Sequence, residues 1–247
     1  MFAHLDLNSI LLILFAISLG GLVKGVISFG LPLVALPILS FVLNPKQAIF
    51  LLFLTVIAVN IREIKFKNFD RYKKIIPLSI GVLSGIIIGS VLFHKIENNL
   101  ISQMIGFTII LAVIINLTGL KIKETLLLNN FFSICYGFFC GIIGGMTTLV
   151  GPLIAVYLVS LKLSKDEFSE LISLTIFACL APIYSIFFIY QPIIFNDFII
   201  SLCFAFPAVL MQFLGFKIRK KLPQEIFRKV ILLMLTIIGI LVIYKNI

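Results

Sequence analysis

Long apolar stretches follow one another along the whole chain, each ending at a short polar or glycine-proline interruption. Ten such segments can be distinguished, five in each half. They lie at about 9–28, 31–43, 47–61, 75–93 and 101–120, and at about 131–145, 147–161, 169–190, 195–216 and 230–245. An α-helix of about 20 residues crosses a hydrocarbon core of roughly 30 Å. The pattern therefore predicts an all-α integral membrane protein.

The opening of each half is rich in glycine and proline. Gly21, Gly25, Gly30 and Pro32 mark the first opening, and Gly137, Gly141, Gly144, Gly145 and Pro152 mark the second. This recurrence predicts one membrane domain, 1–247, built from two repeats at about 9–120 and about 131–246. The first two segments of each half are short, so they are either two true spans or a hairpin of half-length helices.

Basic residues gather in short connections between the apolar segments. Of the 20 Lys and Arg residues, six lie in 62–74 and six in 217–229. Because short basic loops stay in the cytoplasm, we expect both loops there and both termini outside, in the plasma or inner membrane. The basic loop follows the third segment of the first half but the fourth segment of the second half. This shift predicts repeats of inverted topology.

Composition narrows the function classes. The chain has 247 residues, of which 61% are apolar and 12% charged, whereas about 25% of residues are charged in soluble domains. No long hydrophilic segment could form a soluble catalytic domain, so we expect neither an enzyme nor a cofactor. The net charge of +10 lies mainly in the two loops, where anionic lipid is the expected neighbour. Nucleic acid is not an expected partner.

With these motifs, the chain resembles the sulfite exporter TauE/SafE family. The resemblance rests on the duplicated glycine and proline openings and on the Gly-x3-Gly spans later in each half, and it covers roughly 10–245. It implies a permease for small sulfur-containing or organic oxyanions, such as sulfite or sulfonates. Lys24 and Phe29 stand where the family usually has small residues or glycine, a departure that would narrow the cavity or add a charge to it.

The two openings supply the candidate substrate site. Broken helices are tolerated in a bilayer only beside protein or a water-filled cavity, and their N-termini attract anions. The candidate substrate-binding residues are Lys24, Ser28, Gly30, Pro32, Gly144, Gly145, Thr147, Thr148 and Pro152. Close helix packing is the other role open to the glycines. Packing is favoured for Gly21, Gly25, Gly137 and Gly141, and the cavity for Gly30, Gly144 and Gly145.

Lys24 is the one charged residue well inside an apolar segment. It either faces the cavity or lies near a membrane face and extends its ammonium group to the lipid headgroups. The ten acidic residues lie at segment ends or in loops, so the sequence predicts no intramembrane carboxylate. The four cysteines (Cys135, Cys140, Cys179 and Cys203) form no CxxC pair, which disfavours metal binding and redox chemistry.

The sequence therefore predicts a polytopic permease for small anions that works by alternating access between inverted repeats. The expected partners are a small anionic substrate and membrane lipid, and a homo-oligomer is compatible with the sequence. A membrane thiol-electron shuttle and a non-transporting membrane scaffold are the alternatives. The shuttle would need a cysteine near the break of each half, but all four lie in the second half.

Overall fold

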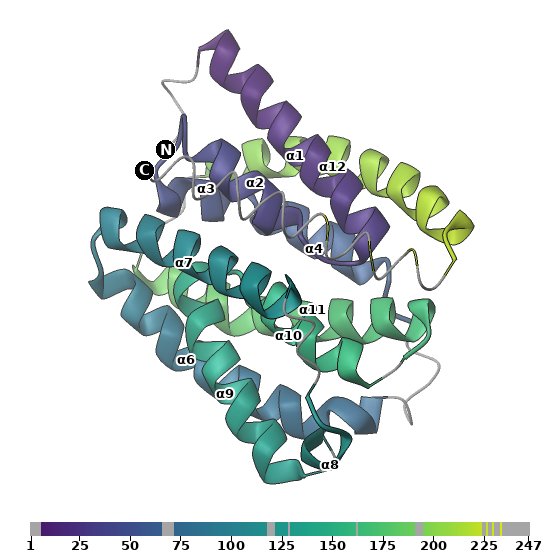
Figure 1. Cartoon of the computed structure of the whole chain (residues 1–247). Helices are drawn as coiled ribbons and strands as arrows, with labels where there is room; N and C mark the ends of the chain where they lie inside the picture. Colours follow the sequence, from purple (N-terminus) through teal and green to yellow (C-terminus); the bar gives the residue numbers. More distant parts are fainter. Residues whose placement is uncertain are drawn as a thin grey trace.

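The computed structural model describes residues 6–65, 72–117, 122–127, 129–161, 163–190 and 195–223, together with 226, 229 and 233. This part of the chain folds into helices joined by short connections (Figure 1). In chain order they are α1 (Leu7–Ile27), α2 (Leu31–Leu39), α3 (Pro45–Leu51), α4 (Phe53–Ile61), the short η1 (Lys73–Ile75), α6 (Ile76–Lys95), α7 (Asn98–Leu117), α8 (Glu124–Leu127), α9 (Asn130–Thr147), α10 (Val150–Ser160), α11 (Lys165–Tyr190) and α12 (Phe195–Lys221).

The described helices include five that are long and apolar enough to cross a membrane. They are α1, α6, α9, α11 and the stretch Asn196–Lys221 of α12. The all-helical fold predicted from the apolar pattern is confirmed for the described residues, and these five helices are compatible with a membrane protein. The predicted segment at 230–245 lies outside the described residues.

The opening of each half combines one long helix with one short helix. α1 has 21 residues and α9 has 18, whereas α2 has nine and α10 has eleven. At 1.5 Å per residue, α2 and α10 are only about 14 and 17 Å long, which is about half of a hydrocarbon core. The chain folds back after α1, because Leu31 lies against Gly20. Neither alternative from the sequence is right as it stands, since only the second helix of each opening is half-length.

Two predicted segment boundaries also change. The segment expected at 47–61 is divided at Leu52 into α3 and α4. α12 continues to Lys221, five residues beyond the predicted end at 216, so that part of the expected loop 217–229 is helical. Its last turn carries Arg219, Lys220 and Lys221, and basic side chains stabilise a helix C-terminus.

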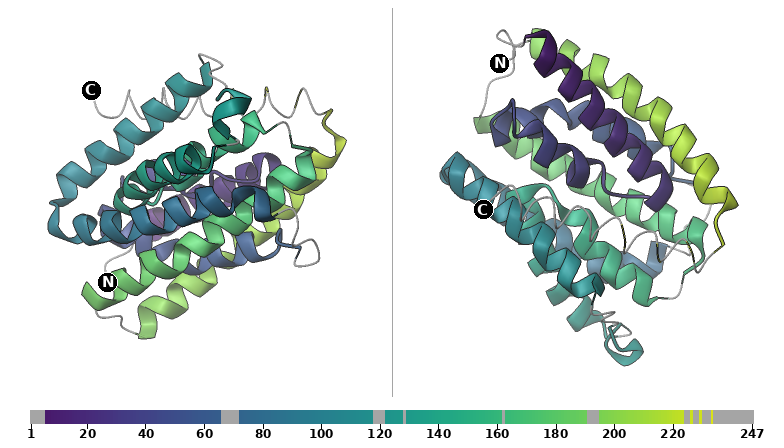
Figure 2. Two further views of the ribbon diagram at one scale, coloured as in Figure 1. Left: turned by 90° about the horizontal axis from the view of Figure 1, so that it is seen from below. Right: turned by 45° about the horizontal axis from the view of Figure 1, so that its top comes forward.

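Glycines bring α1 and α12 into backbone contact. A Cβ atom on Gly25 would lie 2.3 Å from the carbonyl oxygen of Gln212, and Gly21 lies equally close to Ala208. Because residue numbers rise together along the contact, α1 and α12 run parallel. The two helices lie side by side in both Figure 1 and the right view of Figure 2. The packing role predicted for Gly21 and Gly25 is therefore confirmed.

The same arrangement joins α6 and α9. A Cβ atom on Gly141 would lie 2.2 Å from the carbonyl oxygen of Val82, and Gly137 lies 2.3 Å from that of Leu78 in the same sense. α6 and α9 therefore also run parallel, and Gly137 and Gly141 pack as predicted. The first helix of each half (α1 or α9) thus packs on the helix that forms the fourth predicted segment of the other half (α12 or α6).

The two parallel pairs run in opposite directions. The C-terminal ends of α1 and α12 meet near Glu63, where Lys24 and Arg219 both contact its carboxylate. Tyr72, just before α6, lies at this same end, because its hydroxyl group is 2.6 Å from the carbonyl oxygen of Lys65 and 2.7 Å from Glu170 Oε1. α6 and α9 therefore start where α1 and α12 finish.

Candidate functional site

Two corresponding breaks interrupt the openings of the halves. The residue after α1, Ser28, has φ 75°, and the residue after α9, Thr148, has φ 60°. Among the described residues these are the non-glycine positions with positive φ, a conformation that costs about 1–3 kcal/mol. Gly30 also has a positive φ, 101°. Because a strained backbone conformation occurs at the same position in both halves, the two breaks are specific features of this fold.

A half-length helix begins directly after each break. α2 follows Gly30 and α10 follows Leu149, and neither helix has a side chain that caps its N-terminus. Backbone N–H groups of a first turn have no partner within the helix. Pro32 in the first turn of α2 suits this position, because proline has no N–H group to satisfy. Both breaks therefore present the positive end of a helix dipole.

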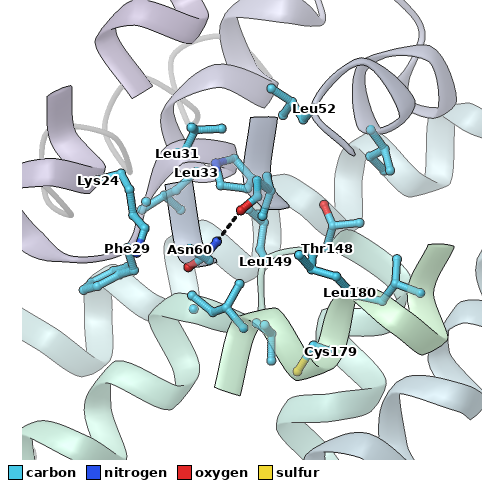
Figure 3. Close-up of a pocket in the computed structure, with 18 of the residues that line it drawn as sticks. Lys24, Phe29, Leu31, Leu33, Leu52, Asn60, Thr148, Leu149, Cys179 and Leu180 are labelled. Atoms are coloured by element: carbon cyan, nitrogen blue, oxygen red, sulfur yellow. Dashed lines mark hydrogen bonds between the residues drawn. The ribbon is translucent and has the colours of Figure 1, made fainter. Parts of the chain in front are cut away.

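The two breaks border one cavity, whose walls come from both halves of the chain (Figure 3). Its water-accessible volume is about 40 Å³, room for about three water molecules. Most of the wall is apolar, and α4 and α11 complete it. The polar residues that line it include Lys24, Asn60, Thr148 and Tyr184. Asn60 donates a 2.7 Å hydrogen bond to the carbonyl oxygen of Val56, while its own amide oxygen is buried with no hydrogen-bond partner.

Part of the predicted substrate-binding site lines this cavity. Of the nine candidate residues, those that line it are Lys24, Gly30, Pro32, Thr148 and Pro152. Thr147 instead holds the second break, because its hydroxyl group donates to the carbonyl oxygen of Ile143 and accepts from the N–H of Leu149.

Gly144 and Gly145 lie in helix contacts. A Cβ atom on Gly144 would lie 2.6 Å from that of Val150, and one on Gly145 would lie 2.6 Å from the carbonyl oxygen of Ile86. Close packing, rather than the cavity favoured from the sequence, therefore explains why both positions are glycine.

Lys24 is buried in a cluster of polar groups, with 1% of its surface exposed. Its Nζ atom lies 3.0 Å from Glu63 Oε2 and 2.7 Å from Ser173 Oγ, and it also donates to the backbone oxygen of Ser28. The ammonium group therefore does not extend to headgroups. Lys24 borders the cavity, as one alternative predicted, but its charge is directed at a carboxylate that the sequence analysis had assigned to a loop.

Arg219 binds the other side of the same carboxylate. Its guanidinium group lies 3.2 Å from Glu63 Oε1 and 2.7 Å from Ser169 Oγ, and it donates to the hydroxyl group of Ser28. The side chains of Glu63 and Arg219 are only 7% and 4% exposed. Glu63 lies at a segment end, as predicted, but its side chain is buried. Arg219 lies within α12 and not in the loop expected at 217–229, and it is buried too.

The cations hold Glu63 ionised. Burial of the Glu63 carboxyl group raises its pKa, but the charges of Lys24 and Arg219 and the hydrogen bond from Ser173 outweigh burial, so that the pKa lies below its ordinary value. We name Lys24, Glu63 and Arg219 the ion triad.

A second, more polar cavity lies on the far side of the ion triad. Its water-accessible volume is about 240 Å³. We call it the vestibule. Its wall contains four basic and two acidic side chains: Arg62, Lys65, Arg219, Lys220, Glu63 and Asp166. Lys24 lines the cavity at the breaks, whereas Glu63 and Arg219 line the vestibule. The ion triad thus lies between the two spaces.

A comparison with protein-family models identifies the family of this chain. The model of the family described as sulfite exporter TauE/SafE matches residues 13–242, nearly the whole chain. The chain belongs to the TauE/SafE family. No curated protein and no solved structure matches it. The resemblance drawn from the glycine and proline openings is therefore confirmed, and the protein is a member of a family of membrane transporters, not of enzymes.

The cysteines of this TauE/SafE chain do not form a redox pair within the described residues. All four are free, and Cys140 and Cys179 are buried. Cys179 lines the cavity at the breaks, but the first half contributes no thiol. The same described part of the chain contains no group of three metal-binding side chains.

Sequence reasoning missed Glu63 and Arg219, although two signals pointed toward Glu63. A buried lysine needs a counter-ion, and Glu63 follows the apolar segment that comes two after Lys24. Ser169 and Ser173 are four residues apart, so they share one face of α11, and that face meets the carboxylate at 3.0 and 2.8 Å. The sequence alone does not reveal that three distant segment ends converge.

Proposed function

We propose that this chain is a secondary permease for small sulfur-containing or organic oxyanions of the sulfite and sulfonate kind. The observation that carries the proposal is the cavity at which the helix breaks of both halves meet, in a chain that belongs to an exporter family. Broken helices at the interface of two repeats commonly form the substrate site of a secondary transporter.

The chemistry of the cavity favours an anion. α2 and α10 start at its wall, so that two helix N-termini and their uncapped N–H groups border the space. Lys24 lies at the same wall, and the vestibule beyond it carries an excess of basic side chains, which attracts anions electrostatically. Room for about three water molecules suits a small ion.

We further propose that the halves are inverted repeats, about 9–120 and about 131–246, and that the permease works by alternating access, with the α1–α12 pair moving against the α6–α9 pair. In support, the α1–α12 pair and the α6–α9 pair are each parallel and run in opposite directions. Each pair takes one helix from each half, so a tilt of one pair against the other would open the central cavity first to one side and then to the other. The ion triad then lies at the cytoplasmic end, where basic residues gather, and both chain termini lie outside.

The test is anion flux in liposomes that contain the full-length protein. Labelled sulfite, sulfoacetate and acetate are offered to wild type, Lys24→Ala, Thr148→Val and the control Lys95→Ala, which removes an exposed cation from the end of α6. We expect saturable sulfite flux in wild type and in Lys95→Ala. Lys24→Ala should lose about tenfold or more in apparent affinity, because a cation of the site is gone.

Two results would count against the proposal. If none of the anions crosses faster than in protein-free liposomes, the chain is not an anion permease. If Lys24→Ala carries sulfite with the affinity of Lys95→Ala, the charge of Lys24 does not serve the anion. If Thr148→Val carries sulfite as well as wild type does, the Thr148 hydroxyl group does not bind the anion, and the rest of the proposed site is unaffected.

A further inference from the structure

The ion triad has more positive than negative charge. Lys24 and Arg219 bring two cations to one carboxylate, at 3.0 and 3.2 Å, and each cation binds a different oxygen of Glu63. Three serine hydroxyl groups complete the surroundings of these ions: Ser28, Ser169 and Ser173. Two convergent cations with hydroxyl donors are the usual environment of a bound oxyanion.

Glu63 occupies this environment as if it were a ligand. Its two oxygens accept hydrogen bonds from Lys24, Arg219, Ser169 and Ser173. The carboxylate reaches the cations from the connection after α4, whereas Lys24, Ser169 and Ser173 belong to long helices. Lys24, Ser169 and Ser173 are therefore held on long helices, whereas the Glu63 carboxylate belongs to a two-residue turn after α4.

We propose that Lys24, Arg219 and the three serines form a second oxyanion site, and that the Glu63 carboxylate fills it until a sulfur oxyanion takes its place. This inference rests on the proposed permease function. A sulfite or sulfonate group presents several oxygens to cations and hydroxyl donors, as the carboxylate does. The exchange breaks no covalent bond: one anion leaves the two cations as another arrives.

The proposed oxyanion site lies next to both cavities. The ion triad lies between the cavity at the breaks and the vestibule, so an anion that replaces Glu63 stands between these two spaces. Both cations also bind Ser28, one through its backbone oxygen and the other through its hydroxyl group. Since Ser28 is the residue of the first break, arrival of the anion acts directly on the backbone that shapes the cavity.

The exchange predicts tighter substrate binding when the internal anion is removed. When a site is blocked in most molecules, its apparent Kd equals the intrinsic Kd divided by the fraction of molecules in which the site is open. If Glu63 fills the site in about nine molecules of ten, Glu63→Gln should bind sulfite about tenfold more tightly than wild type. The gain should vanish in Lys24→Met/Glu63→Gln, because one of the two cations is then missing.

The experiment measures sulfite binding to the full-length protein in detergent, by calorimetry and by the rise in melting temperature with sulfite. The variants are wild type, Glu63→Gln, Lys24→Met/Glu63→Gln and the control Glu97→Gln, which neutralises an exposed carboxylate before α7. Because an unpaired buried cation destabilises a fold, Glu63→Asp serves as a second variant. Its shorter side chain cannot bridge both cations, so its sulfite affinity should lie between those of wild type and Glu63→Gln.

The outcomes separate this inference from the permease function. A tenfold gain in Glu63→Gln, or an intermediate gain in Glu63→Asp, with none in Glu97→Gln supports the exchange. If wild type carries and binds sulfite but neither Glu63 variant binds it more tightly, the exchange is refuted and the permease function stands. If sulfite neither binds to nor crosses with any of the proteins, both proposals fail.

Discussion

The close contact between α6 and α9 makes Gly141 a sharp test of the fold. A Cβ atom at this position would lie 2.2 Å from the carbonyl oxygen of Val82, although real Cβ atoms stay at least 3.0 Å from such an atom. Gly141→Ala must therefore push the two helices apart by roughly 0.8 Å. A gap of 0.5–1 Å forfeits about a quarter to a half of each dispersion contact. We expect a loss of about 1–3 kcal/mol in the free energy of unfolding.

The assay is SDS-induced unfolding of the full-length protein in mixed micelles, followed by circular dichroism. Gly151→Ala is the matched control, because a Cβ atom there meets its nearest neighbour, Ile176, at an ordinary 3.4 Å. Alanine also favours a helix over glycine by about 1 kcal/mol, so Gly151→Ala should be at least as stable as wild type. Equal stability of Gly141→Ala and Gly151→Ala would refute the backbone contact between α6 and α9.

Three further predictions concern the break, the cavity and the ion triad. Gly30→Ala should lose about 1–3 kcal/mol in the same SDS assay, because a φ of 101° strains any side chain; unchanged stability would contradict that conformation. In a protein whose other cysteines are replaced by serine, saturating sulfite should slow the alkylation of Cys179, which lines the cavity. An unchanged alkylation rate would contradict sulfite binding in this cavity. Because the pKa of the Glu63 carboxyl group is lower when folded, its stabilisation is complete above the ordinary value of 4.5 and is lost as pH falls through the folded value. Acid should therefore destabilise wild type more than Glu63→Gln, and equal acid sensitivity would contradict the ion triad.

Much of the fold follows from local sequence patterns. The four-residue spacing of Gly21 with Gly25 and of Gly137 with Gly141 predicts two close helix contacts, and both exist. The breaks were predictable only in part: glycine and proline cluster beside them, but Gly21, Pro182 and Pro207 lie inside continuous helices. The ends of the helices were harder to predict, because basic residues suit both a loop and a helix C-terminus. The helix α12, for example, continues to Lys221, beyond its predicted end.

The chemistry of the site depends on contacts between distant parts of the chain. Lys24 and Arg219 are 195 residues apart in sequence, and nothing in either neighbourhood shows that they share the carboxylate of Glu63. Only the parallel packing of α1 on α12 brings their C-terminal ends together. Likewise, Gly144 and Thr147 belong to the second opening by position, but their contacts serve helix packing and the shape of the break.

Sulfite counterflow is the measurement that bears most directly on the central claim. Liposomes that contain the wild-type protein are loaded with unlabelled sulfite and diluted into a trace of labelled sulfite. The account predicts transient accumulation of label that saturates with sulfite concentration and is absent from protein-free liposomes. Label that enters both kinds of liposome at the same rate would contradict the claim that this chain carries small sulfur oxyanions.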